Sequence, residues 1–300
     1  MSQLVQLRQK IRSVQTTKKI THAVRLVSMS LYNKLDKSTL TLKTYTKKLK
    51  TLFLGLIAHV PNWKNTLLFP GDALDKTPLV IIIATSKGLC GSLNSNLFRY
   101  IDSSLFLEKQ QEPKFIAIGQ RAIAFVKEKG FAHQMLSSYA ELNSSNFIAL
   151  ADDLVEKITN KISPYSSVTF YSNEAKSFFA QRPCKVSIVP MLAEPSLSGD
   201  GLDEMQKTSD SDDLQELLIW EQDKNSVLDY LAIRYLRSSI IQILFESLRA
   251  EHASRFLAME NSTNNAQKYL ERLTLQFNKV RQSLITKEVS ELTAGQPVVR

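Results

Sequence analysis

The sequence predicts an α/β protein: a long antiparallel coiled coil of the N- and C-terminal helices, together with a small α/β domain in the middle of the chain. Three observations lead to this fold class. Residues 1–54 and 202–294 contain neither Gly nor Pro, nearly all Gly and Pro lie between them, and apolar residues at both ends recur every three or four positions. We therefore divide the chain into an N-terminal helix (1–58), an α/β domain (59–205) and a C-terminal helix (206–300).

The C-terminal helix is the longest feature of the chain. Its apolar positions follow coiled-coil spacing in two runs, which are Ile240, Ile243, Ser247, Ala250, Ser254 and Leu257, and then Leu270, Leu273, Phe277, Val280 and Leu284. If only residues 214–292 are helical, a rise of about 1.5 Å per residue already gives a rod of roughly 120 Å. A globular chain of this length is not that wide, so the rod is expected to project from its domain and to need a partner for its apolar seam.

The N-terminal helix supplies that partner. Its apolar spacing continues through Leu42, Tyr45, Leu49, Leu52 and Leu56. The ends of a domain often lie close together, so a domain over residues 59–205 would release both terminal helices side by side. We therefore expect the two helices to pair as an antiparallel hairpin.

The middle of the chain alternates between strand and helix patterns. Residues 79–84 form a continuous apolar run, which is typical of a strand buried on both faces. Further strands are expected over 114–119, 168–171 and 186–189, and helices over 95–109, 121–129 and 145–161. This order predicts a small Rossmann-like domain with a largely parallel sheet.

The net charge of +9 is concentrated near the N-terminus, where the first fifty residues hold twelve Lys and Arg against one acid, Asp36. A mitochondrial presequence has such a composition, but here the helical pattern continues far past presequence length. Nucleic-acid binding would also suit the charge, but residues 1–31 contain no aromatic side chain for stacking and no helix-turn-helix punctuation. Neither interpretation is favoured, and no nucleic-acid partner is expected.

Membrane spans and disulfide bonds are not expected either. The strongest apolar run is six residues long, against the roughly twenty that cross a bilayer. Cys90 and Cys184 are too few for a disulfide framework, which favours a reducing compartment.

No pattern predicts catalysis, a cofactor or a metal site. The loop after the first strand has two glycines ahead of a helix, but it lacks the Lys-Ser/Thr ending of a P-loop and the dinucleotide spacing. We expect Gly88 and Gly91 to permit a tight turn and Cys90 to pack as a small apolar side chain. The four histidines are scattered, and His252 is expected to face solvent.

Several segments resemble the gamma subunit of F-type ATP synthases, in the family's order along the chain. The matching segments are VQTTKKITHAVRLV (14–27), SKGLCGSLN (86–94), SLRAEHASRFLAMENSTNNA (247–266) and FNKVRQSLITKEVSEL (277–292). Val24 stands where the family usually has Met, and Leu31 where it usually has Lys.

The resemblance implies a central rotor shaft without chemistry of its own. In that family the helical hairpin lies inside a ring of alternating alpha and beta subunits. The α/β domain lies on the membrane c-ring, with the epsilon subunit beside it. With no leader before the first motif, we expect a peripheral position on the cytoplasmic face of a bacterial inner membrane. The residues that the resemblance and the charge mark as contacts with the alpha–beta ring are Lys18, Lys19, Val24, Arg25, Arg255, Gln282 and Thr286.

Two other classes of function remain as alternatives. A coiled-coil scaffold or adaptor would share the hairpin, but it has no reason to carry the terminal motifs. A nucleotide-using enzyme would need ligand chemistry in the loop around Gly88, where the sequence provides none that is recognisable.

Overall fold

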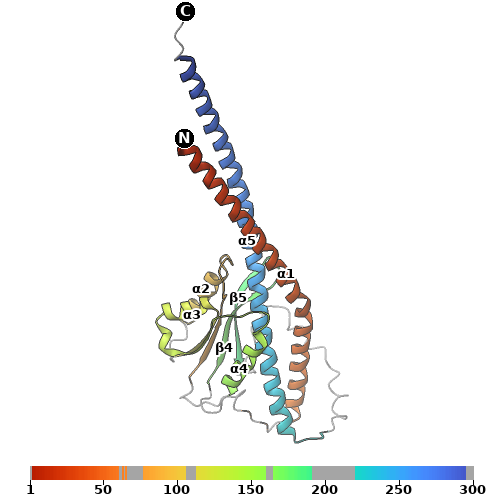
Figure 1. The fold of residues 1–300 in the computed structure, drawn as a ribbon. Coiled ribbons are helices and arrows are strands. Elements are labelled where there is room, and N and C mark those ends of the chain that lie inside the picture. The colour runs from red at the N-terminus through yellow and green to blue at the C-terminus, as the bar shows by residue number, and fades with distance from the viewer. Residues whose placement is uncertain are drawn as a thin grey trace, which may run out of the picture.

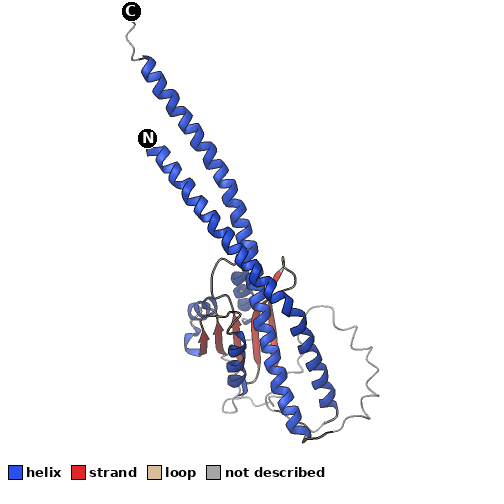
Figure 2. Ribbon diagram, turned by 45° about the vertical axis from the view of Figure 1, so that its right-hand side comes forward, coloured by secondary structure: helices blue, strands red, loops and turns tan. Residues whose placement is uncertain are grey.

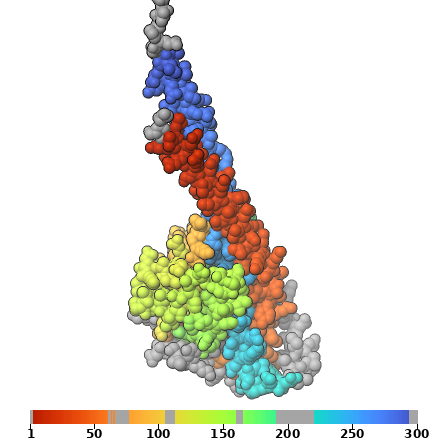
Figure 3. Space-filling view, in the orientation of Figure 1, coloured from red at the N-terminus to blue at the C-terminus, as the bar shows by residue number. Residues whose placement is uncertain are grey.

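The computed structural model describes residues 2–60, 63, 65, 77–105, 113–159, 165–190 and 220–294. Two long helices dominate it: α1 (Ser2–Ala58) and α5 (Lys224–Ala294). At about 1.5 Å per residue, α5 is roughly 105 Å long. The α/β domain lies on one side of the hairpin, and the end of the hairpin that holds both chain termini stands clear of it (Figures 1 and 3). The predicted projecting rod is confirmed.

The start of α5 differs from the expectation. Residues 220–223 are not helical, and the helix begins at Lys224, whereas the expected helix included residues 220–223. Asp223 sets this start, because its carboxylate accepts hydrogen bonds from the Ser226 backbone N–H at 3.0 Å and from the Ser226 hydroxyl at 3.1 Å. Such a cap satisfies backbone donors that would otherwise be free at a helix start. Residues 191–219, which include the predicted boundary at 206, lie outside the described residues.

The two helices run antiparallel, as predicted, but the seam of α1 is shifted from the expected one. Tyr45 and Leu52 are 51% and 52% exposed, whereas Thr46 and Phe53 are buried. The inward positions of α1 repeat every seven residues, and this repeat places residues 46 and 53 against α5. Thr46 can be buried there because its hydroxyl forms a hydrogen bond of 2.8 Å with the hydroxyl of Ser238 on α5.

The domain contains one five-stranded sheet with the strand order β3-β2-β1-β4-β5. Its strands are β1 (Leu79–Ile83), β2 (Lys114–Ile118), β3 (Met135–Tyr139), β4 (Val168–Ala175) and β5 (Gln181–Val189). The first four are parallel and β5 pairs antiparallel with β4. The sequence missed β3, because this edge strand buries only alternate side chains and lacks a continuous apolar run.

Helices cover both faces of the sheet. The remaining elements are α2 (Leu93–Leu105), α3 (Gln120–Glu128), the short 3-10 helix η1 (Phe131–Gln134) and α4 (Phe147–Thr159). One face packs against α2 and α3, and the other packs against α4 and the middle of α5. Ile240, Leu244 and Leu248 of α5 lie in the same apolar core as Ile81 of β1 and Phe170 of β4. The sheet therefore lies directly on the hairpin (Figure 2).

Candidate functional site

The glycine-containing loop after β1 is fixed against α5. Cys90 is buried, and its carbonyl accepts a hydrogen bond of 2.7 Å from the Ser254 hydroxyl. Burial raises the pKa of the Cys90 thiol to about 11, so the side chain is neutral and poorly nucleophilic at neutral pH. Cys90 is buried as expected, but its surroundings are polar, because its thiol donates to the Gly88 carbonyl at 3.4 Å.

The turn itself is made differently from the expectation. Gly91 adopts the left-handed conformation with φ +56°, but its second left-handed residue is Leu89 with φ +68°, not Gly88. Asn94 at the start of α2 bonds to both the backbone N–H and the hydroxyl of Thr85. The polar groups around this loop are thus joined to one another within the chain.

Arg255 does not face outward as expected. It is 8% exposed, and its guanidinium pairs with Glu251 and donates to the Gly88 carbonyl at 3.4 Å and to Nδ1 of His252 at 3.4 Å. Its donors bind groups of its own chain, and its role as a contact with a surrounding ring stays a prediction.

His252 also departs from the expectation. Its side chain is half-buried beside Arg255, and burial together with that positive charge lowers the pKa of the imidazole to about 4. The ring is therefore neutral at physiological pH. The interpretation as a solvent-facing histidine was wrong.

The basic residues of α1 are divided between the seam and the surface. Lys18 Nζ donates to Gln267 Oε1 at 2.5 Å, and Arg25 forms an ion pair with Glu260. Both side chains are half-buried between the helices, as is Val24 on the flank of the seam, whereas Lys19 is exposed. Of the charges proposed for outside contacts, two thus already have partners on α5.

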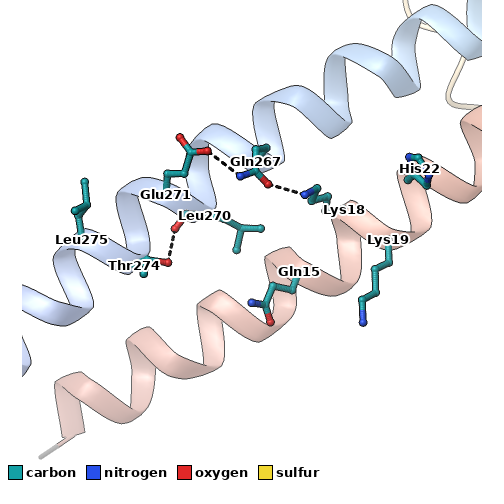
Figure 4. A pocket seen from close by; sticks show the side chains of 9 residues that line it. All are labelled: Gln15, Lys18, Lys19, His22, Gln267, Leu270, Glu271, Thr274 and Leu275. Atoms are coloured by element: carbon teal, nitrogen blue, oxygen red, sulfur yellow. Dashed lines mark hydrogen bonds between the residues drawn. The ribbon is translucent and has the colours of Figure 1, made fainter.

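An open groove of about 990 Å³ lies between α1 and α5 at this level (Figure 4). It is lined by Gln15, Lys18, Lys19, His22, Gln267, Leu270, Glu271, Thr274 and Leu275. Gln267 links its two walls, because it accepts from Lys18 and donates to Glu271 at 2.7 Å. Most of its lining residues have polar or charged side chains, and Leu270 and Leu275 add apolar surface.

Gln282 and Thr286 are exposed near the free end of α5. The Thr286 hydroxyl donates to the Gln282 carbonyl at 3.0 Å, so it is bound to its own helix. Both side chains are placed where a neighbouring subunit could reach them.

Sequence reasoning missed a polar layer in the seam. Thr263 donates to the hydroxyl of Thr21 at 2.9 Å, between the Lys18–Gln267 and Arg25–Glu260 pairs. The signal was present, because these α1 residues fall on the same seven-residue repeat as the apolar seam positions. A search restricted to apolar residues passes over them.

The described residues contain no group of three or more His, Cys, Asp or Glu side chains that could hold a metal ion. Across those residues, too, no helix is long and apolar enough to cross a membrane.

Comparison with known proteins places the chain in a family. A family model described as ATP synthase matches residues 3–297, almost the whole chain. The ATP synthase gamma chain of Pelotomaculum thermopropionicum is 31% identical over 98% of both chains. That of Herminiimonas arsenicoxydans is 30% identical, also over 98% of both chains. The chain belongs to the ATP synthase gamma family.

Solved structures of ATP synthase complexes contain chains with the same fold. A chain in the Euglena gracilis mitochondrial ATP synthase (OSCP/F1/c-ring) aligns with a TM-score of 0.64 and 17% identity, over 98% of this chain and 93% of that one. A chain in the Tetrahymena thermophila central stalk and c-ring aligns with a TM-score of 0.54 and 20% identity, over 81% of this chain and 98% of that one. The match over the whole chain favours a gamma subunit over a general coiled-coil scaffold.

Proposed function

We propose that this gamma-family chain is the central stalk of an F-type ATP synthase. In this role it is a rotating shaft that couples ion flow through the membrane rotor to ATP synthesis or hydrolysis in the alpha–beta ring. The observation that carries the proposal is a two-helix rod extending well beyond its α/β domain, in a chain that matches the family from residue 3 to residue 297.

A shaft of this kind acts as a moving ligand. Its two helices differ in length, 57 residues against 71, and the excess positive charge is concentrated on α1. The rod therefore has no rotational symmetry, and each ring subunit meets different side chains at each angle. A ligand shifts a conformational equilibrium only by its difference in affinity for the two states. Turning an asymmetric rod changes that difference for each catalytic subunit in sequence.

The contact residues are proposed from their placement. Lys19, Gln282 and Thr286 are exposed on the free part of the hairpin and can reach a surrounding ring. Lys18 and Arg25 have partners on α5, and we propose that their contacts with the ring are weaker than those of the exposed residues.

The partners proposed are the alpha and beta subunits, the epsilon subunit and the membrane c-ring. The similar solved structures are of an ATP synthase rotor, an OSCP/F1/c-ring assembly and a central stalk with its c-ring, which supports this assignment. We place the chain peripherally on the cytoplasmic face of a bacterial inner membrane. We also retain the division at 1–58, 59–205 and 206–300, with the middle of α5 serving both the shaft and the domain core.

The subunit itself is proposed to be non-catalytic. The isolated chain is expected to show no ATPase activity, and mixing with alpha and beta subunits is expected to restore ATP turnover. Steady turnover by the isolated polypeptide, free of contaminating ring, would contradict the proposal. Copurification gives a second measurement, because a central stalk brings down alpha and beta subunits in fixed stoichiometry.

A further inference from the structure

Two charged side chains of α5, Glu246 and Arg249, are buried where three elements meet. Each residue is 8% exposed, in a stretch of α5 from residue 243 to 251 that is buried at every position. Burying charges is costly, and replacing a buried ion pair by apolar side chains is often neutral or stabilising. The pair therefore needs an explanation other than stability.

The bonds of Arg249 supply that explanation, because its guanidinium reaches all three elements. It donates to the Ala175 carbonyl at the end of β4 at 2.6 Å, to Asp36 of α1 at 3.0 Å, and to Glu246 of α5 at 2.8 Å. Lys43 of α1 approaches the other oxygen of Glu246 at 2.9 Å. A planar guanidinium with three acceptors on three elements fixes directions as well as distances.

Besides the bonds of Arg249, α1 meets the domain through the ring of Tyr32, which packs edge-to-face on Phe178 with the ring centroids 4.8 Å apart, and through Leu35 and Leu42 in the core. In the described residues α1 packs along α5, whereas its packing against the sheet is slight. Apolar contact between α1 and the core, through Leu35 and Leu42, favours burial without favouring one direction. Polar bonds such as that between Thr46 and Ser238 hold α1 on α5, whereas the Arg249 guanidinium joins α1, α5 and β4 through a single side chain.

We propose that Arg249 is a positioning residue that holds α1 and the α/β domain at one fixed angle about α5. The role of this angle in rotation rests on the proposed function. If torque enters the shaft at the α/β domain, both helices rotate with the domain only if neither helix slips against it. The angle itself is a property of the single chain and can be tested without the complex.

The decisive variant replaces the whole buried pair, Glu246→Leu with Arg249→Met. This change leaves net charge unaltered, and it leaves no unpaired buried charge, because Asp36 and Lys43 are each about half exposed and remain in water. We expect the melting temperature to stay close to that of the natural chain. The matched control, Arg237→Met with Asp152→Leu, removes a charge-neutral pair between α5 and α4 that does not involve α1.

The angle is measured on the full chain by the distance distribution between two spin labels, with both natural cysteines replaced by alanine. The first pair of labels, at Leu40→Cys on α1 and Lys127→Cys on α3, reports the position of α1 relative to the domain. Both positions are exposed. The second pair, at Ile233→Cys on α5 and Lys127→Cys on α3, reports the position of α5 relative to the domain. We expect the first distribution to broaden in the double variant and the second to stay narrow. In the control variant the first is expected to stay narrow.

Unchanged width of the first distribution in the double variant would overturn the proposal, and so would equal broadening in the control. If the double variant fails to fold, Arg249→Lys decides the matter. Lysine keeps the charge but lacks the planar fork that points donors in fixed directions toward three elements. The first distribution should therefore broaden again, and a natural width would overturn the proposal. In a reconstituted complex we further expect ion pumping per ATP hydrolysed to fall. Failure of the natural chain to support any coupled activity would contradict the proposed function and leave the spin-label result valid.

Discussion

Arg255→Ala tests the buried ion pair of Arg255 with Glu251. The substitution leaves Glu251, which is 7% exposed, without its positive partner. Removing one member of a buried ion pair typically costs about 3 to 5 kcal/mol. At roughly 2 to 4 °C per kcal/mol for a large domain, the melting temperature should fall by about 6 to 20 °C. Thermal unfolding followed by circular dichroism measures this directly.

The pH dependence of that loss identifies its cause. Burial already raises the pKa of the Glu251 carboxyl, while Arg255 opposes the shift. Without the guanidinium the pKa of the Glu251 carboxyl rises further, so the folded state favours the protonated carboxyl over the charged one. A carboxyl whose folded pKa is raised contributes stability below its unfolded pKa and loses it as pH rises. The loss caused by Arg255→Ala should therefore be larger at pH 7.5 than at pH 5.

The control is Arg255→Met with Glu251→Leu, which removes both charges together. This double variant is expected to be much closer to the natural chain in stability than Arg255→Ala. If the single and double variants lose the same stability, or if Arg255→Ala loses less than about 1 kcal/mol, the argument that Arg255 compensates a buried carboxylate is wrong.

Three further predictions follow from the placement of single side chains. The folded pKa of His252 is lowered from 6.5 to about 4, so its contribution to stability is complete above about pH 6.5 and is lost as pH falls from there through the folded pKa. His252→Gln should flatten the dependence of stability on pH in that range, and an unchanged profile would contradict the assignment. Lys18→Gln with Lys19→Gln should reduce the salt dependence of association with an alpha–beta ring, measured from about 0.1 M to 1 M salt, and an unchanged slope would indicate another partner. Gln282→Ala with Thr286→Ala should slow turnover of the complex while leaving the melting temperature unchanged, because both side chains are exposed; natural turnover would remove them from the contact set.

The architecture was predictable because Gly and Pro divide this chain so sharply. Their absence from both ends permits long helices, and the seven-residue repeat specifies the pairing. The boundaries were less predictable. The start of α5 depends on one cap, Asp223, and a stretch free of Gly and Pro does not reveal which acid will serve. Strand β3 was missed because an edge strand with half of its side chains exposed resembles a loop in sequence.

The candidate site was harder to predict, for a physical reason. Periodicity identifies one buried face of a helix, but the middle of α5 is enclosed both by α1 and by the sheet. Arg255 and His252 lie on faces that a lone hairpin would expose, and the domain that covers them folds from a distant part of the sequence. Lys19, Gln282 and Thr286 lie where nothing in the described chain covers them, and their exposure could be inferred from the helix pattern.

The pairing of the two chain ends also determines how the protein can be made. Lys18 bonds to Gln267, 249 residues later. At about 5 to 20 residues per second, a ribosome needs roughly 12 to 50 s to make that partner. During this time α1 has been synthesised but has no α5 to cover its seam, and the sheet lacks the helix that completes its core. Contacts this distant in sequence make folding slow and leave apolar surface exposed to aggregation. The nascent chain therefore needs protection until its last third has been synthesised.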